Sequence, residues 1–112
     1  MEPSAREVVM SYIQAMDKRD YPAARQYLQD SVFIKGPGGE AFRSPDEFLA
    51  MMERQHGRYD IRRVFADGDD VCVLYNFVTD KATVFFCSWY QIKAGKIASI
   101  ETIFDPRAFT GG

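Results

Sequence analysis

The sequence predicts an α+β fold in which a curved antiparallel sheet wraps around three helices from the N-terminal half of the chain. Apolar side chains recur at helical spacing up to Gly57 and alternate at strand spacing beyond it. Four β-favouring runs follow that change, separated by short turn signals. The chain has 112 residues, of which 46% are hydrophobic. This length and composition favour a single domain over residues 1–112, with enough apolar surface for a real core.

The first two predicted helices begin at residues that commonly cap helices. Ser4 and Glu7 have the spacing of a capping box, and apolar residues recur behind them as far as Asp17. Asp20 caps a short second helix whose apolar side chains continue to Leu28. These two segments predict a helical pair at the start of the chain.

A short strand and a third helix are expected next. Residues 31–36 favour a strand, which the glycine-rich segment 36–39 must end. Ser44, Pro45 and Glu47 form a typical helix start, and the apolar face behind them ends near His56 and Gly57.

The strands of the antiparallel meander are predicted at residues 58–66, 70–79, 82–93 and 96–104. These runs are longer than the usual strand of roughly five or six residues. We expect them to bend, because twist and bulges curl long strands, and we expect the helices to fill the concave side. Beyond the last run, Asp105 precedes Pro106, a pair that predicts a turn.

The two central strands are apolar on both faces. In the run 70–79, Cys72, Leu74 and Val78 alternate with other apolar residues. A sheet with one solvent-exposed face would have polar residues at every second position instead. Leaving the outer face in water would expose an aromatic patch larger than monomers tolerate. We therefore expect a symmetric homodimer through the outer face. The alternative is that one end of the chain covers this face, but those segments are short.

Charge and cysteine content narrow the expected partners and location. The net charge is -2 and the basic residues are scattered, so neither a nucleic acid nor a membrane is an expected partner. No apolar run approaches the ~20 residues that span a bilayer, and the start lacks a signal-peptide pattern, which predicts a cytoplasmic protein. Cys72 and Cys87 lack metal-binding spacing and are expected to be reduced core residues. No metal and no cofactor are predicted.

The order of the elements resembles a known superfamily. Two N-terminal helices, a short strand, a capped third helix and a meander closing on Gly95-Lys96-Ile97-Ala98-Ser99-Ile100 are similar to the superfamily of nuclear transport factor two. Its members include ketosteroid isomerases, SnoaL-like polyketide cyclases and limonene epoxide hydrolases, and the likeness covers nearly the whole chain. The resemblance implies a cone-shaped roll with an interior pocket and a dimer across the convex sheet. It does not imply one activity, because one fold hosts many functions.

The family's catalytic positions are mostly unfilled in this chain. Tyr12 stands where the isomerases have a hydrogen-bonding tyrosine, but the position of their base is Gly36 and that of their donor aspartate is Ser88. The Asp-Arg-Asp set of the epoxide hydrolases is also missing from the stretches around Asn76 and Glu101. The resemblance therefore favours a binding protein over an isomerase or hydrolase of the usual type.

The turn before the third strand of the meander decides which side chains face the pocket. We predict a three-residue loop at residues 80–82, whereas a two-residue loop would shift the preceding strand and turn its other face inward. With the three-residue loop, Leu74 faces the concave side together with the ligand-binding candidates Tyr12, Asn76, Phe86, Ser88, Tyr90, Ile100 and Thr102. The pocket is then apolar with a few neutral polar groups, which is typical of small-molecule sites.

Two functions from different classes remain open at this point. The first is a homodimeric protein that binds a small apolar molecule in its interior through neutral hydrogen bonds. The second is an isomerase, cyclase or hydrolase that acts on an apolar cyclic substrate, with Asn76, Glu101 or His56 supplying the acid, the base or a held water. A dimerisation module with a filled interior is a third interpretation.

Overall fold

The computed structural model describes residues 3–36 and 38–104. This part of the chain contains, in order, α1 (Ala5–Asp17), α2 (Tyr21–Arg25), β1 (Leu28–Lys35), β2 (Ala41–Phe42), α3 (Pro45–Gln55), β3 (Arg58–Asp67), β4 (Asp70–Val78), β5 (Thr83–Lys93) and β6 (Lys96–Phe104). The turn predicted at Asp105 lies outside the described residues. Within them, no helix is long and apolar enough to cross a membrane.

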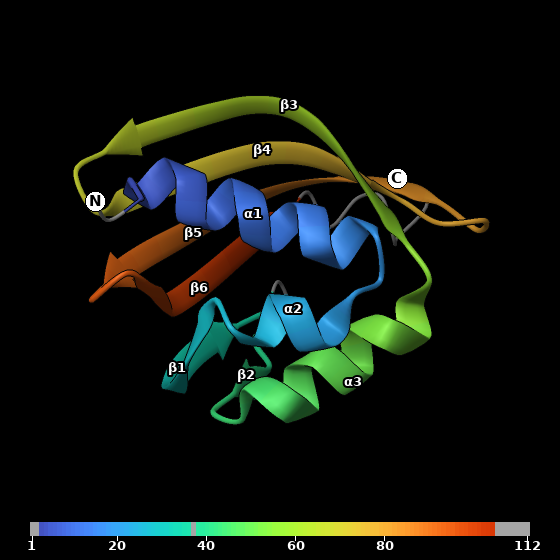
Figure 1. Ribbon diagram of the computed structural model, residues 1–112. Coiled ribbons are helices and arrows are strands. Elements are labelled where there is room, and N and C mark those ends of the chain that lie inside the picture. Colours follow the sequence, from blue (N-terminus) through green and yellow to red (C-terminus); the bar gives the residue numbers. More distant parts are fainter. Residues whose placement is uncertain (1–2, 37, 105–112) are drawn as a thin grey trace.

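All six strands belong to one curved sheet in the order β2-β1-β6-β5-β4-β3. Figure 1 shows β3 to β6 bending over α1, with α2 and α3 beside them. Strands β3 to β6 form the predicted antiparallel meander, whereas β1 pairs with β6 in parallel. The sheet is not closed, since β2 and β3 are its edges, and β3 carries an irregularity between Ile61 and Arg63. The α+β class and the curved sheet are confirmed.

The helices begin where the capping residues predict. The Ser4 hydroxyl accepts a hydrogen bond from the Glu7 N–H, and the Glu7 carboxylate accepts one from the Ser4 N–H, each at 3.1 Å. Asp20 and Ser44 each accept a bond from the backbone N–H three residues further on. These bonds pair amide groups that the first turn of a helix otherwise leaves without partners.

The short elements differ from the prediction in two places. Helix α2 ends at Arg25, and Leu28 begins β1 rather than continuing a helix, because it pairs with Ile97 of β6. No pattern in the sequence predicts β2. This strand forms because the chain turns back after the glycine-rich segment and pairs Phe42 with Ile34.

Arg25 joins three elements at the side of the molecule where α2 lies. Its guanidinium is 2.7 Å from Asp30 and 3.1 Å from Asp46, and it donates to the Leu28 carbonyl at 3.1 Å. The hydrogen bond from Arg25 also lowers the pKa of the Asp30 carboxyl. Helix α2, strand β1 and helix α3 are thereby held together.

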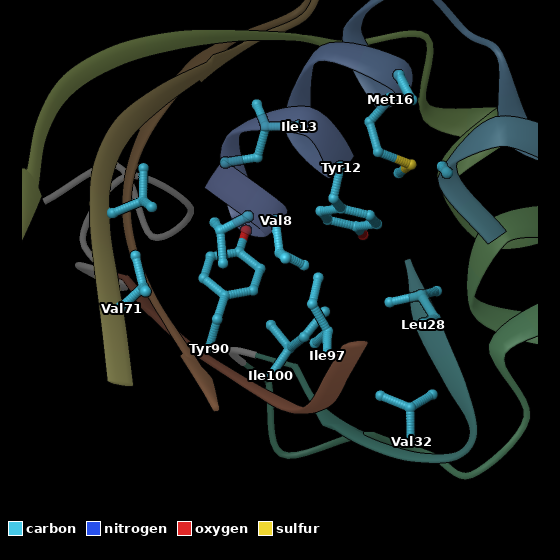
Figure 2. Close-up of a cluster of buried hydrophobic side chains, with 14 of the residues drawn as sticks. Val8, Tyr12, Ile13, Met16, Leu28, Val32, Val71, Tyr90, Ile97 and Ile100 are labelled. Carbon is cyan, nitrogen blue, oxygen red and sulfur yellow. The ribbon is translucent and has the colours of Figure 1, made fainter. Parts of the chain in front are cut away.

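The hydrophobic core lies between α1 and the concave face of the sheet. Figure 2 shows Val8 and Tyr12 of α1 facing Tyr90 and Ile100 of the strands. The rings of Tyr12 and Tyr90 meet edge-on with their centroids 6.1 Å apart, a favourable arrangement for aromatic pairs. This packing fixes α1 against the strands that also line the cavity described below.

The β4–β5 turn has two residues, so the predicted three-residue loop is wrong. The Thr79 N–H donates to the Ala82 carbonyl at 2.9 Å and closes the turn over Asp80 and Lys81. The Thr79 hydroxyl accepts from the Lys81 N–H at 3.3 Å and from the Ala82 N–H at 3.1 Å. A local hydroxyl bond of this kind is a common way to fix a turn.

The shorter turn exchanges the two faces of β4. Tyr75 pairs with Phe86 and faces the cavity, whereas Leu74 and Asn76 lie on the outer face rather than on the predicted concave one. Because β4 and β5 are apolar on both faces, their alternation does not specify the register. The hydrogen bonds of Thr79 fix the length of the turn and thereby the register of β4 against β5.

The outer face of the sheet carries a group of apolar side chains that we call the outer patch. Its members are Phe65, Cys72, Leu74, Phe85, Cys87, Trp89 and Ile103. Ile103 is 62% exposed and Phe65 is 59% exposed. The prediction that Cys72 and Cys87 are core residues is wrong, because the register turns both of them outward and leaves them partly exposed.

Candidate functional site

A cavity of about 440 Å³ lies between the concave face, α3 and the loop from β1 to β2. Helix α3 supplies Phe48, Met51, Met52 and Gln55, and the strands supply mainly aromatic and aliphatic side chains. The buried residues Tyr12, Ser88 and Tyr90 mark the deep end of the cavity. The exposed residues Glu40 and Lys81 mark its open end.

The structure brings most of the predicted ligand-binding residues to this cavity. Its lining includes Tyr12, Phe86, Ser88, Tyr90, Ile100 and Thr102. The exception is Asn76, which the one-residue shift of β4 places on the outer face. There the Asn76 amide donates to the Asp60 carboxylate at 3.5 Å. Asn76 is therefore in no position to hold a ligand or a water in the cavity.

The other acid and base candidates also lie away from the cavity. Glu101 is exposed and pairs with Trp89 on the outer face. His56 ends α3 in the left-handed conformation, with a φ of 52°. Its Nδ1 atom lies 3.4 Å from the Arg19 guanidinium, a side chain that does not line the cavity. An acid or base acting inside the cavity must come from another residue.

Three hydroxyl groups form a connected row in the wall of the cavity. The Ser88 Oγ atom lies 2.9 Å from the Tyr75 hydroxyl and 2.8 Å from the Thr102 Oγ1 atom. We call Tyr75, Ser88 and Thr102 the hydroxyl chain. Ser88 is only 1% exposed, so the middle of the chain is sealed from bulk water. Tyr75 is not among the residues predicted to line the pocket, because the predicted register turned it outward.

The tyrosines of the cavity are uncharged hydrogen-bonding groups at neutral pH. Burial raises the pKa of Tyr75 to about 12, although its bond with Ser88 opposes the rise. Burial likewise raises the pKa values of Tyr12, Tyr59 and Tyr90. The inner part of the cavity therefore offers neutral hydroxyls and apolar surface.

Glu40 is a further cavity residue that was not predicted from the sequence. The Gly36 N–H donates to the Glu40 carbonyl at 2.7 Å, which folds the loop back on itself. A Cβ atom at position 36 would overlap the Glu40 carboxylate, so this carboxylate fills the space into which a side chain at 36 would project. The sequence feature that could have indicated this arrangement is a glycine at position 36, which has no side chain, followed by a carboxylate four residues later.

The described residues contain no cluster of three or more His, Cys, Asp or Glu side chains that could hold a metal ion. Every fully buried side-chain nitrogen or oxygen in this part of the chain has a hydrogen-bond partner. The interior of the described chain is thus mainly apolar, its buried polar atoms have hydrogen-bond partners, and the hydroxyl chain runs along one wall of the cavity.

The curved sheet, the helices packed in its hollow and the cavity between them define an α+β roll with an interior site. A family model described as the SnoaL-like domain matches residues 9–100, and the chain belongs to this family. The comparison with curated proteins gives no match.

Solved structures with the same fold carry several kinds of name. An NTF2-like protein of unknown function from Cytophaga hutchinsonii matches with a TM-score of 0.89 and 25% identity, covering 98% of this chain and 97% of its own. A putative ketosteroid isomerase from Kribbella flavida matches with a TM-score of 0.84 and 15% identity, covering 94% and 82%. A putative SnoaL-like polyketide cyclase from Shewanella denitrificans matches with a TM-score of 0.83 and 12% identity, covering 96% and 94%. At the last two identities the likeness concerns the fold alone.

Proposed function

We propose that this protein binds one small, largely apolar molecule in the cavity of each chain. The observation that carries the proposal is the cavity itself, about 440 Å³ in volume and walled by aromatic and aliphatic side chains around a short row of hydroxyls. Its size lies within the roughly 300–1,000 Å³ common for ligand pockets, and a few placed polar groups in an apolar wall are typical of them.

The test is saturable binding of the uncharged fluorescent dye N-phenyl-1-naphthylamine. We expect one dye per chain, and we expect Ala82→Trp to weaken binding about tenfold, since Ala82 lines the open end of the cavity. The matched control is Thr83→Trp, because the neighbouring residue is exposed and does not line the cavity. Dye binding that is absent, or equally affected by both substitutions, contradicts the proposal.

A second candidate function is a proton-transfer reaction of the isomerase or cyclase type, and Glu40 favours it. Glu40 lines a cavity whose wall carries uncharged hydrogen-bond donors. The Glu40 carboxylate would remove a proton from a ligand carbon beside a carbonyl, so that the C–H electron pair forms the C=C bond of an enolate and the C=O π pair moves to the oxygen. A hydroxyl would stabilise the resulting enolate, and the proton would return to carbon from Glu40.

Deuterium exchange into 2-tetralone in D₂O, followed by nuclear magnetic resonance, tests the second candidate. We expect the protein to accelerate exchange beside the carbonyl and Glu40→Gln to abolish the acceleration while dye binding persists. Glu53→Gln is the matched control, since Glu53 is exposed on α3 and does not line the cavity. Exchange that continues in Glu40→Gln rules out Glu40 as the base.

We also propose that a second copy of the chain covers the outer patch. The patch lies across β3 to β6, and a group of exposed apolar side chains of this kind marks an interaction surface. Arg63 of β3 and Glu101 of β6 flank it on opposite sides. A two-fold axis along the strands would set β3 of one copy opposite β6 of the other and bring these opposite charges together. Sedimentation equilibrium should give twice the 12.8 kDa mass of one chain.

A cytoplasmic location, as the sequence predicts, remains part of the proposal. The two cysteines are free in the structure, which suits a reducing compartment. Fractionation of cells that express the chain with a C-terminal tag would test this location.

A further inference from the structure

We propose that the open end of the cavity recognises a cation, so that the ligand is a ring compound carrying a protonated amine. Glu40 supplies the negative charge, and Phe42 and Phe48 supply aromatic rings. This inference rests on the proposed function, because it assumes that a small molecule enters the cavity. It adds the chemical class of that molecule and does not require Glu40 to act as a base.

The carboxylate of Glu40 lies in a space that two glycines leave open. A Cβ atom at Gly36 would overlap its Oε1 atom, and a Cβ atom at Gly38 would overlap its Oε2 atom. Gly36 lines the cavity as Glu40 does, so one carboxylate oxygen lies beside the cavity lining. The backbone of this loop therefore sets the position of a negative charge at the open end.

This carboxylate has no partner in the part of the chain that the structure describes. The salt bridges there are those of Arg25 with Asp30 and Asp46. Lys81, the other charged residue among those that line the cavity, lies on the β4–β5 turn and forms no salt bridge with Glu40. A carboxylate in this state can accept a charge-assisted hydrogen bond from an ammonium group that the ligand brings.

An aromatic pair lies next to Glu40 in the lining. Phe42 of β2 follows Glu40 by two residues, and its ring meets the Phe48 ring of α3 edge-on, with the centroids 5.7 Å apart. Figure 1 shows β2 beside α3. The face of an aromatic ring attracts a cation within about 6 Å of its centre and repels an anion. A carboxylate and two aromatic rings together favour an ammonium group.

Lys81 is less suited to hold an anion than Glu40 is to hold a cation. It lies in a two-residue turn and is exposed, and its ammonium group is a strongly hydrated charge on a flexible stem. Binding an anion there would require this long side chain to become ordered. A charge of either sign at the deep end would lose its water among neutral groups. The amine should therefore stay at the open end while the ring points inward.

Three probes that share one skeleton test this inference: tetralin, 2-aminotetralin and tetralin-2-carboxylate. Their affinities are measured at pH 7, where an alkyl amine is protonated, by displacement of N-phenyl-1-naphthylamine. We expect the amine to bind about fivefold more tightly than the carboxylate. Raising the salt concentration to about 0.5 M should reduce this preference, because salt screens exposed charges.

The ratio of amine affinity to tetralin affinity isolates the contribution of the charge, since both probes fill the cavity with the same ring system. Glu40→Gln should lower this ratio about fivefold. Phe42→Leu removes a ring but keeps an apolar side chain, and it should lower the ratio about threefold. Lys81→Gln should raise the ratio, because it removes the cation that opposes the amine.

Two variants make the same chemical changes outside the cavity. Glu53→Gln removes a negative charge from the exposed surface of α3, and Phe33→Leu removes an exposed ring of β1. Neither residue lines the cavity, so neither substitution should alter the ratio.

The outcomes separate this inference from the proposed function. If the dye and tetralin bind but Glu40→Gln leaves the ratio unchanged, the cavity is a binding site and the inference about the amine is wrong. A carboxylate that binds more tightly than the amine, and loses this advantage in Lys81→Gln, shows an anion site and likewise overturns it. If neither the dye nor any of the three probes binds, both the proposed function and this inference fail.

Discussion

Tyr75 illustrates how burial controls the charge of one side chain in the cavity. Its hydroxyl is enclosed and bonded to Ser88, and burial raises its pKa to about 12. The ordinary value in an unfolded chain is about 10. Because the folded state holds its proton more tightly, the contribution of Tyr75 to stability is complete below about pH 10 and is lost as the pH rises toward 12.

Replacing Tyr75 by Phe should make folding stability less sensitive to alkaline pH. Between pH 8 and about pH 11 the unchanged protein should lose about 1.4 kcal/mol more unfolding free energy than the Tyr75→Phe variant, as one pKa unit of linkage requires. Urea unfolding at the two pH values measures this difference. Tyr27→Phe, at a residue outside the cavity, is the control and should follow the unchanged protein. Equal losses in all three proteins would contradict the assigned pKa shift.

At the scale of elements, the junction between α3 and β3 shapes one wall of the cavity. His56 ends α3 in the left-handed conformation, and Gly57 leads directly into β3. A Cβ atom at position 57 would overlap the ring of Phe77, a cavity residue on β4. The absence of a side chain at Gly57 therefore sets how closely the junction approaches β4.

The substitution Gly57→Ala should displace the Phe77 ring and disturb the cavity. We expect the free energy of unfolding to fall by about 1–3 kcal/mol, as in other overpacked sites, and dye affinity to change with it. Denaturant unfolding and dye titration measure the two effects. Adding Phe77→Leu removes the overlap and should restore most of the lost stability. A single Gly57→Ala variant as stable as the unchanged protein would disprove the close contact.

The elements were more predictable than their pairing. The capping residues Ser4, Asp20 and Ser44 mark the helix starts because these signals are local in sequence, and period-two runs mark the four long strands. The strand β2 and the parallel pairing of β1 with β6 depend on contacts between distant residues. No local pattern contains that information.

The candidate site was predictable only where register did not matter. Tyr12, Phe86, Ser88, Tyr90, Ile100 and Thr102 lie on elements whose inward face was assigned correctly, and they line the cavity. Asn76 was misplaced because β4 is apolar on both faces, so its position depended on the length of one turn. Glu40 was missed because it reaches the cavity lining through a loop that folds back at Gly36, which no local pattern indicates.

At the scale of the whole molecule, the sheet separates the two surfaces to which functions are proposed. The cavity opens on the concave side, and the outer patch occupies the other face. A single chain has a Cα radius of gyration of 13.4 Å. A compact particle of two chains would have a radius of about 17 Å. The two states are therefore easily distinguished in solution.

Trp89→Glu should separate a dimer formed through the outer patch, because it places a charge on both sides of the interface. Solution scattering should then report a decrease from about 17 Å toward the radius of a single chain. Dye binding should persist, since Trp89 does not line the cavity. Gln14→Glu adds a charge on the exposed surface of α1 and should leave the larger particle intact. An unaltered scattering radius in Trp89→Glu would contradict this mode of association.

The open edge of the sheet at β3 has a consequence for solubility at high concentration. An edge strand presents backbone groups that could recruit further strands and seed fibrils. Here the irregularity between Ile61 and Arg63 interrupts the flat ladder, and Arg58, Asp60 and Arg62 place charges along the same strand. A fibril that grew from β3 would have to bury those charges and remove the irregularity. Strand β3 therefore lies at an open edge of the sheet but is poorly suited to pair with strands of other molecules.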